Sequence, residues 1–189
     1  MRVSIDSEDI QRAVASIISA IGEDPGREGL IETPRRVAEM YSDLFSGLGK
    51  DPKEVLETVF EEGHRELVVL KDIPFFSICE HHFLPFFGSA DIGYVPSGRV
   101  VGASKLARAL DILARRPQIQ ERLTDQLVDS IVESLQPQGV AAVLSAEHLC
   151  ITLRGVQKPG SKIVTSASRG TLRTQLATKQ EFLALLSQR

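Results

Sequence analysis

Apolar residues recur at helical spacing along the first third of the chain. Between Asp9 and Ile21 they stand three or four positions apart, and a second stripe of the same kind follows the segment "TPRR". We expect Thr33 to cap this second helix and Pro34 to lie in its first turn. A further short helix is expected from Pro52 to Phe60. The N-terminal third is therefore predicted to be helical.

Beyond this region the pattern changes to short runs of branched and aromatic residues. Such runs are typical of strands, and we expect strands in "RELVVLKDI", "FGSADIGYV", "VAAVLS", "EHLCITLRG" and "SKIVTSAS". Between the second and third of these, two apolar stripes predict a helical hairpin, with one helix over residues 104–116 and another that restarts at Pro117. A closing helix is expected over residues 175–187.

The order of these elements predicts an α+β fold, in which an antiparallel sheet packs against the helical hairpin. The chain has 189 residues, a length that fits one domain. We expect a single structural domain overall, with residues 1–60 as an N-terminal helical region and residues 61–189 as the catalytic region.

Composition and charge narrow the classes of function. A hydrophobic content of 42% is sufficient for an ordinary core, and a net charge of −3 gives no general attraction for nucleic acid or acidic membranes. No apolar run approaches the ~18 residues of a membrane span, and the N-terminus lacks the apolar core of a signal peptide. We therefore expect a cytoplasmic protein that binds neither nucleic acid nor membrane. In that compartment its two cysteines are expected to be thiols or metal ligands rather than a disulfide.

Both cysteines and three of the four histidines fall into two short clusters. Cys79, His81 and His82 lie in "SICEHHFLPFFG", and His148 and Cys150 lie in "AEHLCITLRG". If the second segment is a strand, its period of two places His148, Cys150, Thr152 and Arg154 on one polar face and Leu149, Ile151 and Leu153 on the core face.

The clusters together offer a Cys₂His ligand set in Cys79, His82 and Cys150, which suits zinc. Catalytic zinc sites use three protein ligands and keep one position for water, whereas structural sites use four. Two alternatives stay open at this point. His81 or His148 could complete a structural zinc site, or the cysteines could be buried thiols beside core histidines.

Several long segments in register resemble the GTP cyclohydrolase I family: "SICEHHFLPFFG", "VGASKLARAL", "RPQIQERLT", "AEHLCITLRG" and "TSASRG". The resemblance extends from about Gly22 to the C-terminus. It implies the tunnel fold, one catalytic zinc ion per chain, and a ring-shaped homodecamer with active sites at subunit interfaces. It also implies conversion of GTP and water to 7,8-dihydroneopterin triphosphate and formate, the first step of tetrahydrofolate or other pterin synthesis.

The resemblance also implies roles for the clustered residues. Cys79, His82 and Cys150 would bind zinc, which lowers the pKa of a bound water for attack on C8 of the guanine. His148 would be the principal proton donor, with His81 assisting in later steps, because histidine titrates in the useful range. The family's serine for ring opening and recyclisation of the ribose corresponds to Ser104.

The same resemblance supplies candidate ligands for the rest of GTP. Glu121 would accept the guanine N1–H and exocyclic amine, and Gln120 is a weaker candidate for the same pocket. The triphosphate would bind four cations: Lys105, Arg108, Arg154 and Arg36. Two of these, Lys105 and Arg108, share a helix face directly after Ser104, near a helix N-terminus that favours anions.

Two positions and two competing functions qualify this interpretation. Glu39 stands where some relatives carry a lysine, so we leave it out of the phosphate site, and Glu80 is expected to orient a neighbouring group rather than the metal. The competing functions are another tunnel-fold enzyme acting on a purine or pterin, and a non-catalytic zinc-stabilised oligomer. The sequence by itself leaves open the number of subunits, the pathway's end product, a regulatory partner and the role of residues 1–21.

Overall fold

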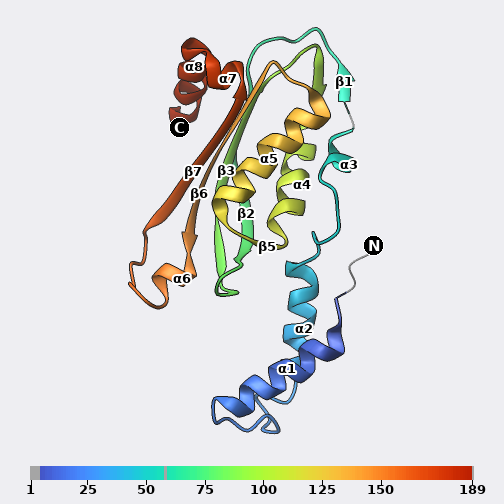
Figure 1. Cartoon of the computed structure of the whole chain (residues 1–189), viewed down its shortest axis with the longest axis vertical. Coiled ribbons are helices and arrows are strands. Elements are labelled where there is room, and N and C mark those ends of the chain that lie inside the picture. Colours follow the sequence, from blue (N-terminus) through green and yellow to red (C-terminus); the bar gives the residue numbers. More distant parts are fainter. Residues whose placement is uncertain (1–4, 58, 189) are drawn as a thin grey trace.

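A five-stranded sheet forms the centre of the computed structural model, which describes residues 5–57 and 59–188 (Figure 1). Its strands lie in the order β5-β2-β3-β6-β7, and all pairs are antiparallel except the short parallel pair of β5 with β2. The strands are β1 (Val59–Glu61), β2 (Val68–Cys79), β3 (Pro85–Val95), β4 (Arg99–Val101), β5 (Pro117–Gln118), β6 (Gly139–His148) and β7 (Lys162–Gly170).

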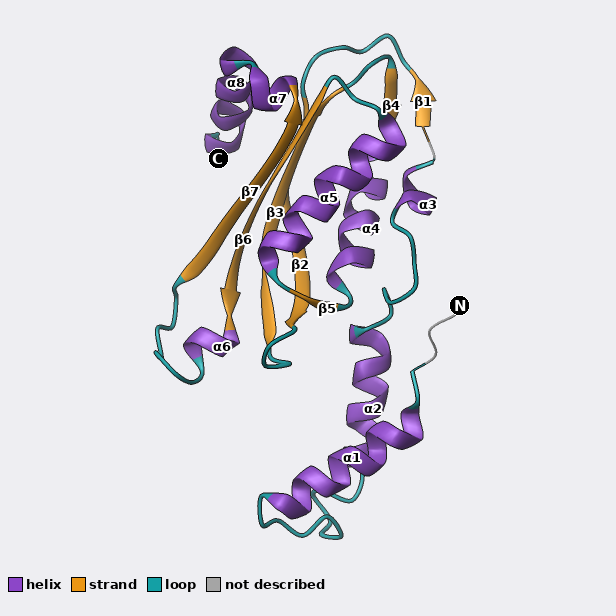
Figure 2. Cartoon of the chain, viewed as in Figure 1, coloured by secondary structure: helices purple, strands orange, loops and turns teal. Residues whose placement is uncertain are grey.

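Helices α4 and α5 form the predicted hairpin and cover one face of this sheet (Figure 2). The helices are α1 (Ser7–Ala20), α2 (Thr33–Leu44), α3 (Lys53–Leu56), α4 (Ala103–Ala114), α5 (Gln120–Leu135), α6 (Leu149–Thr152), α7 (Thr171–Thr174) and α8 (Leu176–Ser187). The predicted antiparallel sheet with a helical hairpin on one face is thus confirmed. Each described helix is too short or too polar to cross a membrane.

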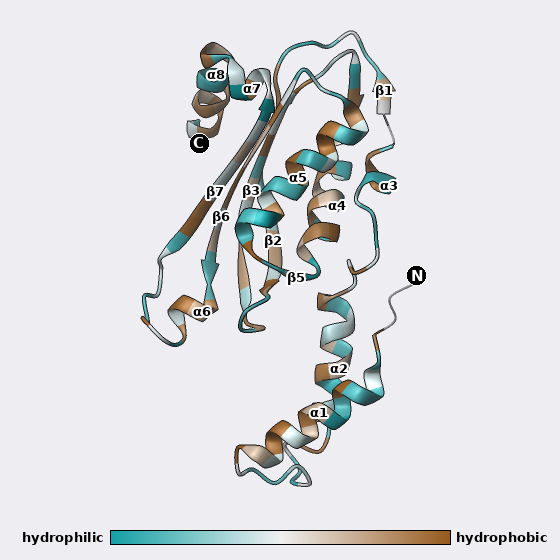
Figure 3. Cartoon of the chain, viewed as in Figure 1, coloured by the Kyte–Doolittle hydropathy of each residue, from teal (hydrophilic) through white to brown (hydrophobic). Residues whose placement is uncertain are grey.

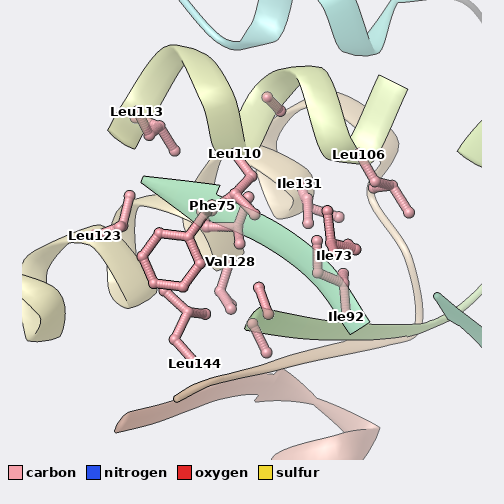
Figure 4. Packing of buried hydrophobic residues seen from close by; sticks show 14 of the residues in the cluster. Ile73, Phe75, Ile92, Leu106, Leu110, Leu113, Leu123, Val128, Ile131 and Leu144 are labelled. Carbon is pink, nitrogen blue, oxygen red and sulfur yellow. The ribbon is translucent and has the colours of Figure 1, made fainter. Parts of the chain in front are cut away.

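The core lies between the hairpin and the sheet (Figure 4). Alternation along β6 explains how both faces of the sheet are used: Val140, Ala142 and Leu144 point into this core, while Ala141 and Val143 face the other side. On that other side α8 packs its Phe182 against β3, where a side chain at Gly93 would lie 2.6 Å from the Phe182 ring. Helix α8 therefore covers part of the second face.

The N-terminal helices extend away from the sheet, although both carry apolar residues (Figure 3). Helix α1 packs mainly on α2, and the chain returns to the body at Gly47, where an added Cβ would lie 2.1 Å from the carbonyl oxygen of Ile112. The helix cap differs from the expectation, because Glu32 rather than Thr33 is the N-cap residue and its side chain makes no capping bond. The proposed boundary at residue 60 falls inside β1, which pairs with β4.

Three predicted elements are wrong in extent. The helix expected from Pro52 to Phe60 ends at Leu56, because Phe60 pairs with Val100 in the small β1–β4 sheet; Thr58 lies outside the described residues. The second helix of the hairpin starts at Gln120 rather than Pro117, since residues 117–118 pair with the end of β2 as β5.

The third correction concerns the segment "EHLCITLRG", which is a strand only in its first two residues. Strand β6 ends at His148 and residues 149–152 form the helical turn α6. The last pair of β3 with β6 is Phe86 with His148. Next to Phe86 stands Pro85, which has no N–H to donate to the ladder. The proposed polar face and core face therefore do not exist, and Leu153 is 65% exposed.

Candidate active site

The three predicted metal ligands converge at one end of the sheet. The ligand atoms of Cys79, His82 and Cys150 all lie within 4.8 Å of one another. Cys79 is the last residue of β2, His82 lies in the turn that follows, and Cys150 lies in α6. The tertiary structure thus brings together residues from two distant segments.

Main-chain hydrogen bonds shape the turn that holds His82. The amide of Cys79 donates to Leu84 O (2.9 Å), and the amide of Phe83 donates to Cys79 O (2.9 Å). The amide of Glu80 donates to Gln118 O (3.0 Å), which ties the turn to β5. The position of His82 relative to Cys79 is therefore set by backbone closure, and His82 Nδ1 lies 3.9 Å from the Cys79 sulfur.

The donor set fits a divalent zinc ion. Burial, followed by the neighbouring Cys79 thiol, raises the pKa of Cys150, while the positive charge of Arg154 lowers it. Two thiols held this close resist becoming two thiolates unless a cation lies between them. Two sulfurs and one imidazole nitrogen are ligands that zinc prefers, and three of them leave a coordination position open.

His148 lies beside this cluster with its ring held on two sides. The ring stacks on Phe86, with centroids 4.5 Å apart and planes 7° apart, and its Nε2 lies 2.8 Å from Gln120 Oε1. Burial lowers the pKa of His148, and the negative charge of Glu121 opposes that shift. His148 is only 7% exposed, so its position is fixed by packing.

Glu80, between the ligands in sequence, bonds to α5 instead of joining the metal cluster. Both terminal nitrogens of Arg122 donate to Glu80 Oε2, at 2.8 and 2.6 Å. The other carboxylate oxygen lies 3.7 Å from His81 Nε2. Glu80 therefore links the metal-binding turn to α5 and faces His81.

One pocket of about 200 Å³ contains seven of the predicted site residues. The parallel pairing of Cys79 with Gln118 places the first turn of α5 beside the metal cluster, which explains why residues of α5 reach the same pocket. The predicted residues that line it are Cys79, His81, His82, Gln120, Glu121, His148 and Cys150.

A sequence model of the family described as "GTP cyclohydrolase I" matches residues 10–187, almost the whole chain. The chain belongs to this family. The "GTP cyclohydrolase 1" of Halalkalibacterium halodurans is 57% identical over 183 residues, which cover 96% of this chain and 97% of that relative. Its counterpart from Dehalococcoides mccartyi is 55% identical over 186 residues (97% and 98%), and that from Clostridioides difficile is 57% identical over 185 residues (97% and 97%).

Other residues that the family resemblance assigned to GTP lie elsewhere in the chain. Ser104, Lys105 and Arg108 stand in the first turns of α4, which begins beside β4, at the opposite end of the sheet from α6 and the turn after β2 (Figure 2). Arg108 lines a different pocket, together with Lys50 and Asp111. The residues expected to bind GTP are thus divided between two ends of the sheet.

The two remaining arginines also differ in position. Arg154 follows α6 and is exposed, and its charge acts on Cys150. Arg36 is exposed on α2, in the part that extends away from the sheet. Its neighbour Arg35 forms ion pairs with Glu32 and Glu39, the residue that stands where some relatives carry a lysine.

Sequence reasoning missed two features of this family member's site. The first is Arg122, the partner of Glu80. Nothing in the sequence indicated this pairing, apart from the position of Arg122 directly after the predicted residues Gln120 and Glu121. Phe83 adopts φ 53°, unusual for a bulky residue, and its ring lies edge-on to Tyr41 of α2 and to Phe45, the C-cap residue of that helix, with centroids 6.5 and 5.7 Å away. Helix α2 therefore contacts the metal-binding turn.

Proposed function

We propose that this chain is a zinc-dependent GTP cyclohydrolase I, an enzyme that acts on GTP in the cytoplasm. It would convert GTP and one water to 7,8-dihydroneopterin triphosphate and formate, the first step towards tetrahydrofolate or another pterin. The observation that carries the proposal is the convergence of a Cys₂His cluster with His148 and Glu121 in one pocket of a chain that matches this family over residues 10–187.

Cys79, His82 and Cys150 would hold one zinc ion per chain, with one coordination position left open. When bound there, zinc supplies Lewis-acid activation of water for attack on C8 of the guanine. His81 and His148 are outside the cluster of three. Their imidazoles are thus free to move protons, so the structural-zinc interpretation needs a fourth ligand that this cluster does not supply.

The proton transfers would be divided between the two histidines. His148, buried against Phe86, would donate a proton to the imidazole ring of the guanine. His81, exposed and 3.7 Å from a carboxylate oxygen of Glu80, would act in later steps. Ser104 would assist ring opening and recyclisation of the ribose.

Glu121 would select guanine through two hydrogen bonds to its N1–H and exocyclic amine. It lies in the pocket's wall in the first turn of α5. Arg36, Lys105, Arg108 and Arg154 would bind the triphosphate. A pocket of about 200 Å³ is smaller than the roughly 300–1,000 Å³ of most ligand pockets, so the nucleotide would need walls beyond this chain.

We infer that a second copy supplies those walls in a ring-shaped homodecamer with the tunnel fold. Ser104, Lys105 and Arg108 lie at the end of the sheet opposite the cluster, and a neighbouring copy could bring this end to the pocket. The face of the sheet away from the hairpin also exposes Phe76 and Val164, at 65% and 64%. Large exposed apolar patches mark interaction surfaces, and a neighbouring copy would cover this one.

The test is turnover of GTP by the purified protein. We expect formate and the absorbance of a reduced pterin to appear together, to stop when a chelator removes zinc, and to return when zinc is added. ATP should be refused, and inosine triphosphate, which lacks the exocyclic amine, should react poorly. Absence of formate from zinc-loaded protein would refute the proposed function.

A further inference from the structure

The side chain of Gln120 is enclosed by groups whose hydrogen-bonding roles are fixed. It is only 1% exposed, and its Nε2 lies 3.0 Å from Leu144 O and 3.0 Å from Ile163 O. Main-chain carbonyl oxygens can only accept hydrogen bonds. The NH₂ group of this amide must therefore point to strands β6 and β7, and the opposite orientation would bring three oxygens together.

The oxygen of the same amide faces His148. Gln120 Oε1 lies 2.8 Å from His148 Nε2. An amide oxygen carries no hydrogen, so the hydrogen of this bond must be on Nε2 of the imidazole. This conclusion holds for the neutral and for the charged ring, because both forms can carry a hydrogen on Nε2.

The other ring nitrogen of His148, Nδ1, has no hydrogen-bond partner among the described residues. In residues 5–57 and 59–188 no hydrogen bond to His148 Nδ1 occurs, and the buried side-chain atoms without a partner there are Gln118 Oε1, Ser134 Oγ and Thr171 Oγ1. Nδ1 is not one of these buried atoms, and His148 lines the pocket. Nδ1 is therefore the nitrogen that is open to the pocket.

We propose that Gln120 is a positioning residue that keeps a hydrogen on Nε2 of His148, so that His148 exchanges protons with the nucleotide through Nδ1 alone. The reaction in which this takes place rests on the proposed function. Nδ1 is then the ring nitrogen that His148 presents to the nucleotide, and a proton-transfer group needs such a fixed orientation. This role differs from the guanine contact expected for Gln120.

Thr165 and Thr124 extend the arrangement behind Gln120. Thr165 Oγ1 lies 3.1 Å from Gln120 Nε2 and 2.6 Å from Thr124 Oγ1, and the Thr124 hydroxyl is 2.7 Å from Gln120 O. A satisfied buried network of this kind keeps its members in one orientation. The Thr165 hydroxyl is an additional partner, because the two carbonyls already orient the amide.

Neutron diffraction from crystals of the zinc-loaded full chain, exchanged into D₂O, tests the proposal directly. We expect deuterium on His148 Nε2 and two deuterium atoms on Gln120 Nε2. Deuterium on Nδ1 with a bare Nε2, or an amide with its oxygen towards β6, would overturn the assignment. This readout does not depend on turnover, so it stays decisive if the protein fails to convert GTP.

Variants then separate positioning from substrate binding. Gln120→Leu should lower kcat by about 10- to 100-fold, the usual cost of losing a group that orients a site histidine, and leave KM for GTP nearly unchanged. Gln120→Glu should recover part of kcat, because a protonated carboxyl can donate to a carbonyl and accept from His148. A rise in KM with unchanged kcat in Gln120→Leu would make Gln120 a guanine ligand and refute the proposal.

Thr165→Val is the matched control. It removes one hydrogen bond from the same amide but leaves both carbonyl partners, so deuterium should stay on His148 Nε2 and kcat should stay close to that of the unaltered protein. If Thr165→Val lowered kcat as much as Gln120→Leu, general loosening of the network would explain both results. If Gln120→Leu does not fold, the neutron map of the unaltered chain and the kinetics of Gln120→Glu decide.

Discussion

His81 and His82 are adjacent in the sequence but have different surroundings. The ring of His82 has its Nδ1 3.9 Å from the Cys79 sulfur, whereas His81 lies 3.7 Å from the carboxylate of Glu80. The two ring planes are 84° apart. One histidine therefore belongs with the thiols and the other with a negative charge, which is why we assign metal binding to the first and proton transfer to the second.

Glu121 is the residue on which selection of guanine should depend. We expect Glu121→Gln to weaken GTP binding by ~1–3 kcal/mol, because a polar group of the bound guanine would then be buried without its partner. The measurement is the KM for GTP and the KM for inosine triphosphate. The difference between these two values should be much smaller in the variant than in the unaltered protein.

Asp125→Asn is the control for this change, because it also removes one negative charge from α5. Asp125 lies one turn further along the helix, where it pairs with Arg169. If Glu121→Gln kept normal GTP affinity and base selectivity, Glu121 would not be a guanine ligand. Its carboxylate would then only complement the dipole of α5 from the first turn.

At the scale of elements, the parallel pairing of β5 with β2 and the turn after β2 assemble the pocket. The sequence predicted the segments that carry the chemistry, because Cys79, His82 and Cys150 stand out by residue type. It did not predict that Cys150 lies in a helical turn. The alternating pattern of the sequence continues past His148, whereas the pairing of β6 with β3 ends at the pair of His148 with Phe86. Partners such as Arg122 for Glu80 were also hidden, because such contacts join residues far apart in the chain.

The contact between α2 and the metal-binding turn gives an element-scale prediction. Phe83 follows His82 directly, and its ring lies against that of Phe45, which is 8% exposed. We expect Phe45→Ala to weaken zinc binding by about 10- to 100-fold, as for other groups that support metal ligands. Competition with a chelator of known affinity is the measurement.

Phe182→Ala serves as the matched control, because Phe182 is as deeply buried but packs against Gly93, on the second face of the sheet. It should lower the free energy of unfolding by roughly 3–5 kcal/mol and leave zinc affinity unchanged. Equal zinc affinity in Phe45→Ala and the unaltered protein would show that α2 does not support the turn.

At the scale of the whole molecule, the candidate ligands of GTP are divided between two ends of the sheet. The metal cluster lies at the end formed by α6 and the turn after β2, and Lys105 and Arg108 lie where α4 begins (Figure 2). Within one copy, the metal cluster and these phosphate ligands are therefore too widely separated to line the same pocket. The proposed active site, shared between copies, would resolve this separation.

Mixed oligomers test that sharing. We expect His148→Ala and Lys105→Ala to be nearly inactive alone, and co-expression of the two to restore activity, because some shared sites then receive His148 from one copy and Lys105 from another. The formate yield of the purified mixture is the measurement.

The control is a mixture of Lys105→Ala with Arg108→Ala. These two residues lie on the same part of α4, so every site in that mixture lacks one of them and no activity should return. If the first mixture stayed as inactive as the second, each active site would be built within a single copy.

The proposed enzyme depends on an open, catalytic zinc centre formed by Cys79, His82 and Cys150 beside free histidines. The decisive measurement is metal analysis of His82→Ala, His148→Ala and His81→Ala, together with their rates with GTP. We predict that His82→Ala loses zinc and activity together. His148→Ala should keep its zinc and lose about 10²- to 10⁴-fold in rate, the usual contribution of a positioned proton-transfer group, and His81→Ala should behave likewise but less severely. If His148→Ala or His81→Ala emptied the site as thoroughly as His82→Ala, that histidine would be a fourth ligand, the site would be closed and structural, and the catalytic account would be contradicted.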